Sequence, residues 1–248
     1  MNLEGKIAVV VGASGGIGRE VSKALAKGGA EVILISDRRE MLEALQKEIL
    51  HEGGKVHLFT SDLSKKTQIV DLAAKIGSKF AKVDILFHTA GYGVYKKLTE
   101  VSFEEWEKSF SVNVDSVFLL TQKLIPQLTK SSKAYVISAG SGMGKIALSG
   151  RSTYCASKFA LRGLMLSLAK EYKETNIKFV LLTMGSILTS FGPLTVEEKK
   201  KKQEKGKEYL DPVWLAHHII TKIGHDTLED EVPIYPSHYF EESRKDRR

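Results

Sequence analysis

The sequence lacks the features that stabilise or anchor a protein from outside its core. Its 248 residues include a single cysteine, Cys155, which excludes a disulfide framework and indicates a reducing compartment. No apolar run approaches the roughly 18 residues that a membrane-spanning helix needs. Residues 1–6 show no basic region leading into a long apolar stretch, so we expect no signal peptide. These absences predict a globular protein of the cytoplasm.

Patterns typical of metal sites and of nucleic-acid binding are also missing. The seven histidines form no His-x3-His or His-Glu-x-x-His pattern, so we expect no metal. Lys and Arg exceed Asp and Glu by 37 to 30, and the excess lies in two runs, 199–202 and 244–248. We interpret both runs as solvated surface. Basic residues do not alternate with aromatic ones, so nucleic acid is not an expected partner.

Short apolar runs alternate with helical patterns along the whole chain. The runs are continuous, as strands covered on both faces require. They lie at 7–11, 32–35, 56–59, 83–87, 134–137, 179–182 and 232–235. Between them apolar residues recur at helical spacing, as in Met41, Leu42, Leu45 and Ile49. We therefore predict an α/β fold, with about seven strands in a doubly wound parallel sheet and helices on both faces. No Pro/Gly-rich linker divides residues 1–248, which favours a single domain.

The segment after the sixth predicted strand breaks this rhythm. Residues 186–206 contain Gly192, Pro193 and the first lysine run. A simple surface excursion would look the same. An insertion at the carboxyl edge of such a sheet is also where a substrate lid would lie, so we expect a lid at about 186–210.

A glycine-rich turn follows the first predicted strand and leads into a helix over 19–27. A pyrophosphate binds well at a helix N-terminus, and the absence of side chains lets the backbone approach it. A tight turn without a ligand would show the same glycines, but the position between a buried strand and a helix favours dinucleotide binding. The contacts expected from this turn are Gly12, Ser14, Gly15, Gly16, Ile17 and Gly18.

An acidic residue ends the second predicted strand, 19 residues after Gly18. Asp37 is placed to bind ribose hydroxyls and would repel a 2′-phosphate, which favours NAD(H) over NADP(H). Arg38 beside it would act in the opposite direction, and a plain surface turn would look the same. Asp62 and Leu63, after the third strand, are candidates for the adenine end of the cofactor.

A tyrosine and a lysine lie one helical turn apart at the start of a later helix. Tyr154 and Lys158 share a helical face, so the ammonium, together with an oxidised nicotinamide, can stabilise the phenolate and bring the pKa of the phenol toward neutral pH. Tyr92 and Lys96 have the same spacing, but flanking glycines make a helix there improbable. The first pair is therefore the candidate for acid/base chemistry.

Two polar residues earlier in the chain fit the same site. Ser141 stands just past the fifth strand, where a hydroxyl can polarise a carbonyl, although a turn would also use it. Asn113 lies in the helical run 112–118, where an amide is costly unless its hydrogen bonds are made. A buried structural amide is the alternative.

The residues just named resemble, in their order and spacing, the motifs of the short-chain dehydrogenase/reductase family. His88-Thr89-Ala90-Gly91 is similar to the family's Asn-Asn-Ala-Gly element, and the resemblance covers essentially the whole chain. It implies a Rossmann-type fold and NAD(P)-dependent hydride transfer between an alcohol and a ketone or aldehyde.

The resemblance also implies roles. Tyr154 would be the acid/base, Ser141 would hold the substrate oxygen, and Lys158 would bind the nicotinamide ribose and shift the tyrosine pKa. Asn113 would anchor a water that relays protons. Further cofactor contacts are implied for Ala90, Gly91, Gly185, Ile187 and Thr189. The sequence departs from the family at three positions: Val11 stands where the family has a threonine, His88 where it has an asparagine, and Met184 where it has a proline. These departures bear on the affinity for the cofactor.

Apolar residues near the expected mouth of the site, Met143 among them, favour an apolar alcohol or carbonyl compound as the substrate.

In the family, the helices matching the apolar patterns at 114–128 and 159–168 build the dimer interface, which implies a homodimer or homotetramer. The alternative function is a catalytically silent dinucleotide-binding sensor or scaffold.

Overall fold

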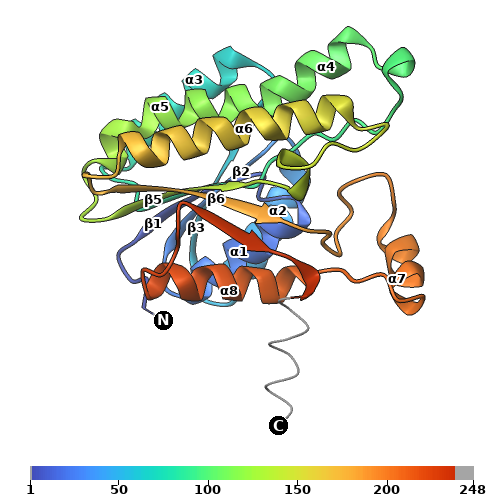
Figure 1. The fold of residues 1–248 in the computed structure, drawn as a ribbon. Helices are drawn as coiled ribbons and strands as arrows, with labels where there is room; N and C mark the ends of the chain where they lie inside the picture. Colours follow the sequence, from blue (N-terminus) through green and yellow to red (C-terminus); the bar gives the residue numbers. More distant parts are fainter. Residues whose placement is uncertain (1, 238–248) are drawn as a thin grey trace.

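The computed structural model describes residues 2–237, and within them seven strands form one sheet in the order β3-β2-β1-β4-β5-β6-β7 (Figure 1). Each neighbouring pair is parallel. The strands are β1 (Ile7–Val11), β2 (Glu31–Ser36), β3 (Lys55–Thr60), β4 (Ile85–His88), β5 (Ala134–Ala139), β6 (Ile177–Met184) and β7 (Glu231–Ile234). The basic run at 244–248 lies outside the described residues.

Helices cover both faces of this sheet. One face carries α1 (Gly16–Lys27), α2 (Arg39–His51) and α8 (Pro212–Gly224). The other carries α3 (Lys66–Lys79), α4 (Phe103–Phe110), α5 (Ser116–Leu128) and α6 (Ser152–Glu171). The short helix α7 (Val196–Glu204) stands to one side of both layers in Figure 1. The predicted α/β fold, doubly wound around a parallel sheet, is confirmed.

The continuous apolar runs are explained by two cores, one on each face of the sheet. In β1, Ala8 and Val10 pack toward one helical layer, and Val9 and Val11 pack toward the other. One detail of the helical pattern is wrong: Met41 is 44% exposed, whereas Leu42, Leu45 and Ile49 are buried. Met41 lies about 100° around the helix from Leu42 and is therefore at the edge of the buried stripe.

The strand order reverses at the centre of the sheet. Val11, at the end of β1, pairs with Ile35 on one side and with His88 on the other. The N–H of Gly12 donates to Ile35 O, while the N–H of Ala90 donates to Val11 O. The loops that follow β1 and β4 therefore diverge at the carboxyl ends of these two strands. This is the place where open α/β sheets bind ligands.

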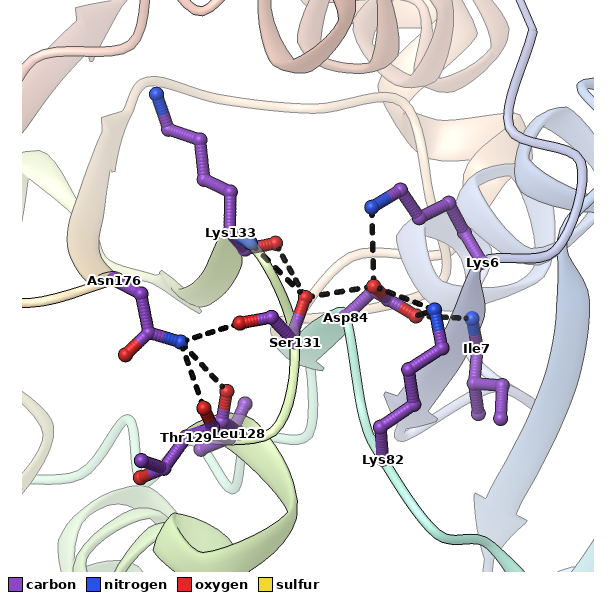
Figure 2. Close-up of polar contacts among 9 residues, drawn as sticks. All are labelled: Lys6, Ile7, Lys82, Asp84, Leu128, Thr129, Ser131, Lys133 and Asn176. Carbon is purple, nitrogen blue, oxygen red and sulfur yellow. Dashed lines mark hydrogen bonds and ion pairs between the residues drawn. The ribbon is translucent and has the colours of Figure 1, made fainter.

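At the opposite edge of the sheet, one buried carboxylate joins segments that are distant in the sequence (Figure 2). Asp84 is 1% exposed and accepts hydrogen bonds from Ile7 N (2.9 Å), Ser131 Oγ (2.7 Å) and Lys6 Nζ (3.1 Å). Lys82 Nζ lies 3.0 Å from it. Burial by itself raises the pKa of Asp84, but these donors together lower it, so the carboxylate remains charged. Hydrogen bonds to this one carboxylate thus connect the N-terminal ends of β1, β4 and β5.

Candidate active site

A cleft of about 1000 Å³ opens at the carboxyl ends of the strands. It brings together the predicted dinucleotide, catalytic and substrate residues, with one exception. Those lining it are Gly12, Ser14, Gly15, Gly16, Ile17, Gly18, Asp37, Arg38, Asp62, Leu63, Ala90, Gly91, Ser141, Met143, Tyr154, Lys158, Gly185, Ile187 and Thr189. Asn113 is the exception and lies beneath the lining.

Three glycines of this turn are packed so closely that no side chain fits at their positions. Gly12 has a φ of +85°, and a Cβ there would lie 2.5 Å from Ala90 N. A Cβ on Gly18 would lie 2.3 Å from Gly12 O, and one on Gly16 would lie 2.5 Å from Thr189 Cγ2. Gly15, the N-cap of α1, supplies no capping side chain. The first N–H groups of α1 therefore remain available to an anion, which fits a dinucleotide pyrophosphate.

An acidic and a basic residue follow each other where β2 ends. Asp37 and Arg38 are both exposed at the rim of the cleft. Arg38 Nε donates to Ser14 Oγ (3.2 Å), and the Ser14 and Ser36 hydroxyls share a hydrogen bond of 2.5 Å. The guanidinium is thus held against the glycine turn, while the carboxylate of Asp37 accepts from Ser36 (3.1 Å). Both signs of charge therefore lie at this end of the cleft.

Tyr154, Lys158 and Ser141 converge on the same part of the cleft. Tyr154 and Lys158 lie one turn apart near the start of α6, and Lys158 Nζ is 5.7 Å from the centroid of the Tyr154 ring. Lys158 Nζ donates to Ala139 O (2.8 Å), at the end of β5. Ser141 follows two residues later, and its Oγ accepts from Met143 N (3.1 Å). The helix and the loop after β5 therefore present a phenol, an ammonium and a hydroxyl together.

Burial favours the uncharged forms of this tyrosine and this lysine. It raises the pKa of Tyr154 above its ordinary value, and the hydrogen bond with Ser141 acts in the opposite direction with a smaller effect. Burial also lowers the pKa of Lys158 to about 8. Desolvation therefore dominates the pKa of Tyr154 in the protein alone, and its lowering by the lysine together with an oxidised nicotinamide stays a prediction.

Asn113 lies in a π-helical turn, Ser111–Asp115, where the sequence predicts ordinary helix. The N–H of Ser116 bonds to Ser111 O, five residues back, so the turn holds one extra residue. The buried amide of Asn113 accepts from Tyr92 N (2.8 Å) and donates to Tyr92 O (2.9 Å) and Ser157 Oγ (2.9 Å). It therefore fixes the loop after β4 against α6.

The sequence profile described as short chain dehydrogenase matches residues 6–200. The chain belongs to the short-chain dehydrogenase family. This membership makes it an oxidoreductase with a nucleotide-binding Rossmann fold. Among its relatives is the 3-oxoacyl-[acyl-carrier-protein] reductase FabG of Thermotoga maritima, which is 30% identical over 82% of each chain.

Solved structures agree with this assignment. A dehydrogenase/reductase from Sinorhizobium meliloti 1021 superposes with a TM-score of 0.85 at 25% identity, over 95% of each chain. A metagenomic short-chain oxidoreductase in complex with NADP gives a TM-score of 0.77 at 27% identity, over 94% of this chain and 98% of the other.

Two departures of this short-chain dehydrogenase from the family pattern have local explanations. At Val11 the missing hydroxyl is replaced by that of Thr89, which donates to Val11 O (2.7 Å) and lies beside Gly18. His88 does not reach the cleft lining. Its Nε2 lies 3.0 Å from Thr121 Oγ1, and burial lowers its pKa to about 3, so it is neutral.

The interpretation of residues 199–202 as solvated surface is wrong for Lys199. This side chain is 7% exposed, and its Nζ donates to Thr189 O (2.7 Å), Phe191 O (2.7 Å) and Ile187 O (3.3 Å). Three ammonium protons meet three loop carbonyls, one of which, Ile187 O, also accepts from Thr189 N (2.9 Å), and these bonds offset the cost of burying the charge. The sequence pattern could not show this, because the carbonyls belong to a loop.

Sequence reasoning also missed side chains that surround Tyr154 from other loops. The Tyr95 ring centroid lies 5.6 Å from that of Tyr154, and the Phe191 centroid lies 6.0 Å from it. Arg151 stacks over Tyr95, with its guanidinium carbon 4.8 Å from the ring centroid. These residues come from three separate segments, and no local spacing connects them.

Within residues 2–237, no helix is long and apolar enough to cross a membrane. The same part of the chain contains no group of three or more His, Cys, Asp or Glu side chains that could hold a metal ion.

Proposed function

We propose that this short-chain dehydrogenase interconverts an alcohol and a ketone or aldehyde, using a nicotinamide dinucleotide. One observation carries the proposal: a single cleft contains the glycine-rich turn at the N-terminus of α1 together with Tyr154, Lys158 and Ser141. When bound, the nicotinamide ring supplies the hydride for reduction or accepts it during oxidation.

The protein supplies binding and proton transfer. Ser141 Oγ holds and polarises the substrate oxygen, and the phenol of Tyr154 donates a proton to that oxygen in reduction or accepts one in oxidation. The ammonium of Lys158, fixed by Ala139 O, binds the nicotinamide ribose and stabilises the phenolate. Asn113 is a positioning residue in this scheme, and one lone pair of its Oδ1 remains for a relay water beside Tyr92 N.

The alternative is a dinucleotide-binding sensor without turnover. The retained phenol, ammonium and hydroxyl favour an enzyme, because a sensor needs none of them. Purified protein assayed with NADH and NADPH against a panel of ketones and aldehydes tests the proposal. Dinucleotide binding without turnover across the panel would favour the sensor.

The choice of dinucleotide depends on the two charges after β2. The related metagenomic oxidoreductase holds NADP, so the comparisons lend no support to the expected preference for NAD(H). We propose that Arg38 binds a 2′-phosphate and that Asp37 opposes it, since both lie at the rim of the cleft.

Arg38→Ala should raise the KM for NADPH about tenfold while changing the KM for NADH less than threefold, because one charge-assisted hydrogen bond at an exposed site is lost. Asp37→Ala should lower the KM for NADPH, because a repulsive carboxylate is removed. Steady-state kinetics with both dinucleotides measures the two effects. The proposal fails if both variants shift the two KM values in parallel.

We also propose that residues 186–210 form the lid over the substrate. The segment begins and ends at one β-bridge, between Ile187 and Leu210, so its base is fixed while its middle extends over the cleft. Thr189 packs on Gly16, and Phe191 lies beside Tyr154. The lid thus contacts both the glycine turn and the reacting phenol.

Apolar residues at the mouth favour an apolar body for the substrate. The cleft lining includes Met143, Ile146, Leu148, Phe191 and Leu194. An apolar secondary alcohol or ketone would bury these side chains when it binds. Turnover of only sugars or polar acids would contradict this assignment.

We propose a homodimer or homotetramer built on α5 and α6. Phe118 on α5 and Phe159 on α6 are 47% and 46% exposed, a large apolar area to leave in water. Light scattering at micromolar concentration should give the mass of a dimer or tetramer. A monomer under these conditions would contradict the proposal.

A further inference from the structure

One cation in the cleft lies beside Tyr154 without an acidic partner. Arg151 directly precedes α6 and lines the cleft. Within residues 2–237, its guanidinium makes no ion pair or hydrogen bond, and its contact is the face of the Tyr95 ring. By contrast Arg162, further along α6, is held by Glu231 at 2.8 Å. The donors of Arg151 are therefore available to a ligand.

The charges lining the cleft are distributed unevenly. Among the described residues that line it, the acidic ones are Asp37 and Asp62, and both follow the strands at the dinucleotide end. The lid side carries Lys202 and Lys207 in addition to Arg151. The substrate end is thus positive and has no carboxylate to neutralise it, which favours an anion there.

The guanidinium is held close to the reacting phenol. Arg151 lies over Tyr95, whose ring is next to that of Tyr154. Its charge acts to lower the pKa of both tyrosines, although burial outweighs it and the pKa of Tyr95 is raised to about 12. Stacking on an aromatic face fixes the guanidinium plane, and a fixed planar set of donors matches a carboxylate or a phosphate.

We propose that the substrate carries an anionic group, a carboxylate or a phosphate, and that Arg151 binds it while the substrate oxygen lies against Tyr154. This inference rests on the proposed function and adds the charge of the substrate to it. Arg151 and Tyr154 lie about one helical turn apart, so the anionic group is a few bonds from the reacting carbon. The apolar lining then covers the rest of the molecule.

Matched pairs of charged and neutral compounds test this. One pair is a 3-oxo acid and its methyl ester, and the other is hydroxyacetone phosphate and hydroxyacetone. Wild type should favour the charged member of at least one pair, and Arg151→Ala should lower kcat/KM for that member by about tenfold or more, with the neutral member within threefold. Arg151→Lys should restore part of the loss. The pair that responds identifies carboxylate or phosphate as the source of the charge.

Lys170→Ala removes an exposed cation from the far end of α6 and serves as the control for net charge. The preference of Lys170→Ala for the charged over the neutral member of each pair should equal that of wild type. Calorimetric binding of the 3-oxo acid and of hydroxyacetone phosphate to wild type and Arg151→Ala, with the oxidised dinucleotide present, gives a readout independent of turnover.

Two results overturn the inference and leave the proposed function intact: wild type turns over charged and neutral members equally, or Arg151→Ala lowers both alike. A complete lack of turnover overturns the proposed function instead. In that case weaker binding of either anion to Arg151→Ala still supports the anion site, and equal binding refutes it.

Discussion

Tyr154→Phe should lower kcat for carbonyl reduction about 1000-fold while changing the dinucleotide Kd less than threefold. The phenol is the proton donor in the proposed reaction, and a positioned general acid contributes about 100- to 10,000-fold. Phenylalanine keeps the ring between Tyr95 and Phe191, so packing in the cleft is retained. Single-turnover kinetics and dinucleotide fluorescence measure the two quantities.

Tyr172→Phe is the matched control, because Tyr172 caps the other end of α6 and does not line the cleft. It should retain wild-type kcat. Equal activity of Tyr154→Phe and wild type would remove Tyr154 from the reaction and leave the enzyme without its proposed acid.

Lys199→Met should lower kcat/KM about 30- to 100-fold, mainly through a higher KM for dinucleotide and substrate. Methionine matches the aliphatic part of the lysine side chain and removes three hydrogen bonds from an ammonium, which together we expect to be worth about 2 to 3 kcal/mol. The released carbonyls of Ile187, Thr189 and Phe191 would turn to water, and the loop would leave the glycine turn and Tyr154.

Lys200→Met and Lys201→Met are the controls, since both lysines are exposed on the same helix and lie outside the cleft lining. Both should behave as wild type. Thermal unfolding separates positioning from general stability: we expect Lys199→Met to keep a melting temperature within a few degrees of wild type. A large fall in melting temperature with an unchanged KM would contradict the role assigned to Lys199.

The fold was predictable because a parallel sheet covered on both faces gives a simple signal. Strands such as β4 and β5 bury every residue, so their sequences are apolar apart from His88 and Ser138. The two parts of the site that depend on local spacing were also predictable in position: the glycine turn between β1 and α1, and Tyr154 with Lys158 on one helical face.

The rest of the site depends on contacts that no short window of sequence contains. Lys199 is buried because loop carbonyls turn toward it. Asn113 is turned inward by a π-helical turn that has no pattern of its own. Arg151 meets Tyr95 only when the loop after β4 folds over α6. In each case the partner is set by tertiary structure: the sequence indicated solvated surface for Lys199 and ordinary helix around Asn113, and it gave no prediction for Arg151.

The carboxylate of Asp84 has a consequence for how this molecule tolerates change. It fastens the three central strands at the rim farthest from the cleft, using side chains that take no part in chemistry. The loops at the opposite rim can therefore be remodelled while the sheet beneath them keeps its register. New specificities are most accessible in such a molecule by altering the lid and the loop after β4, and Asp84 is a position to leave untouched.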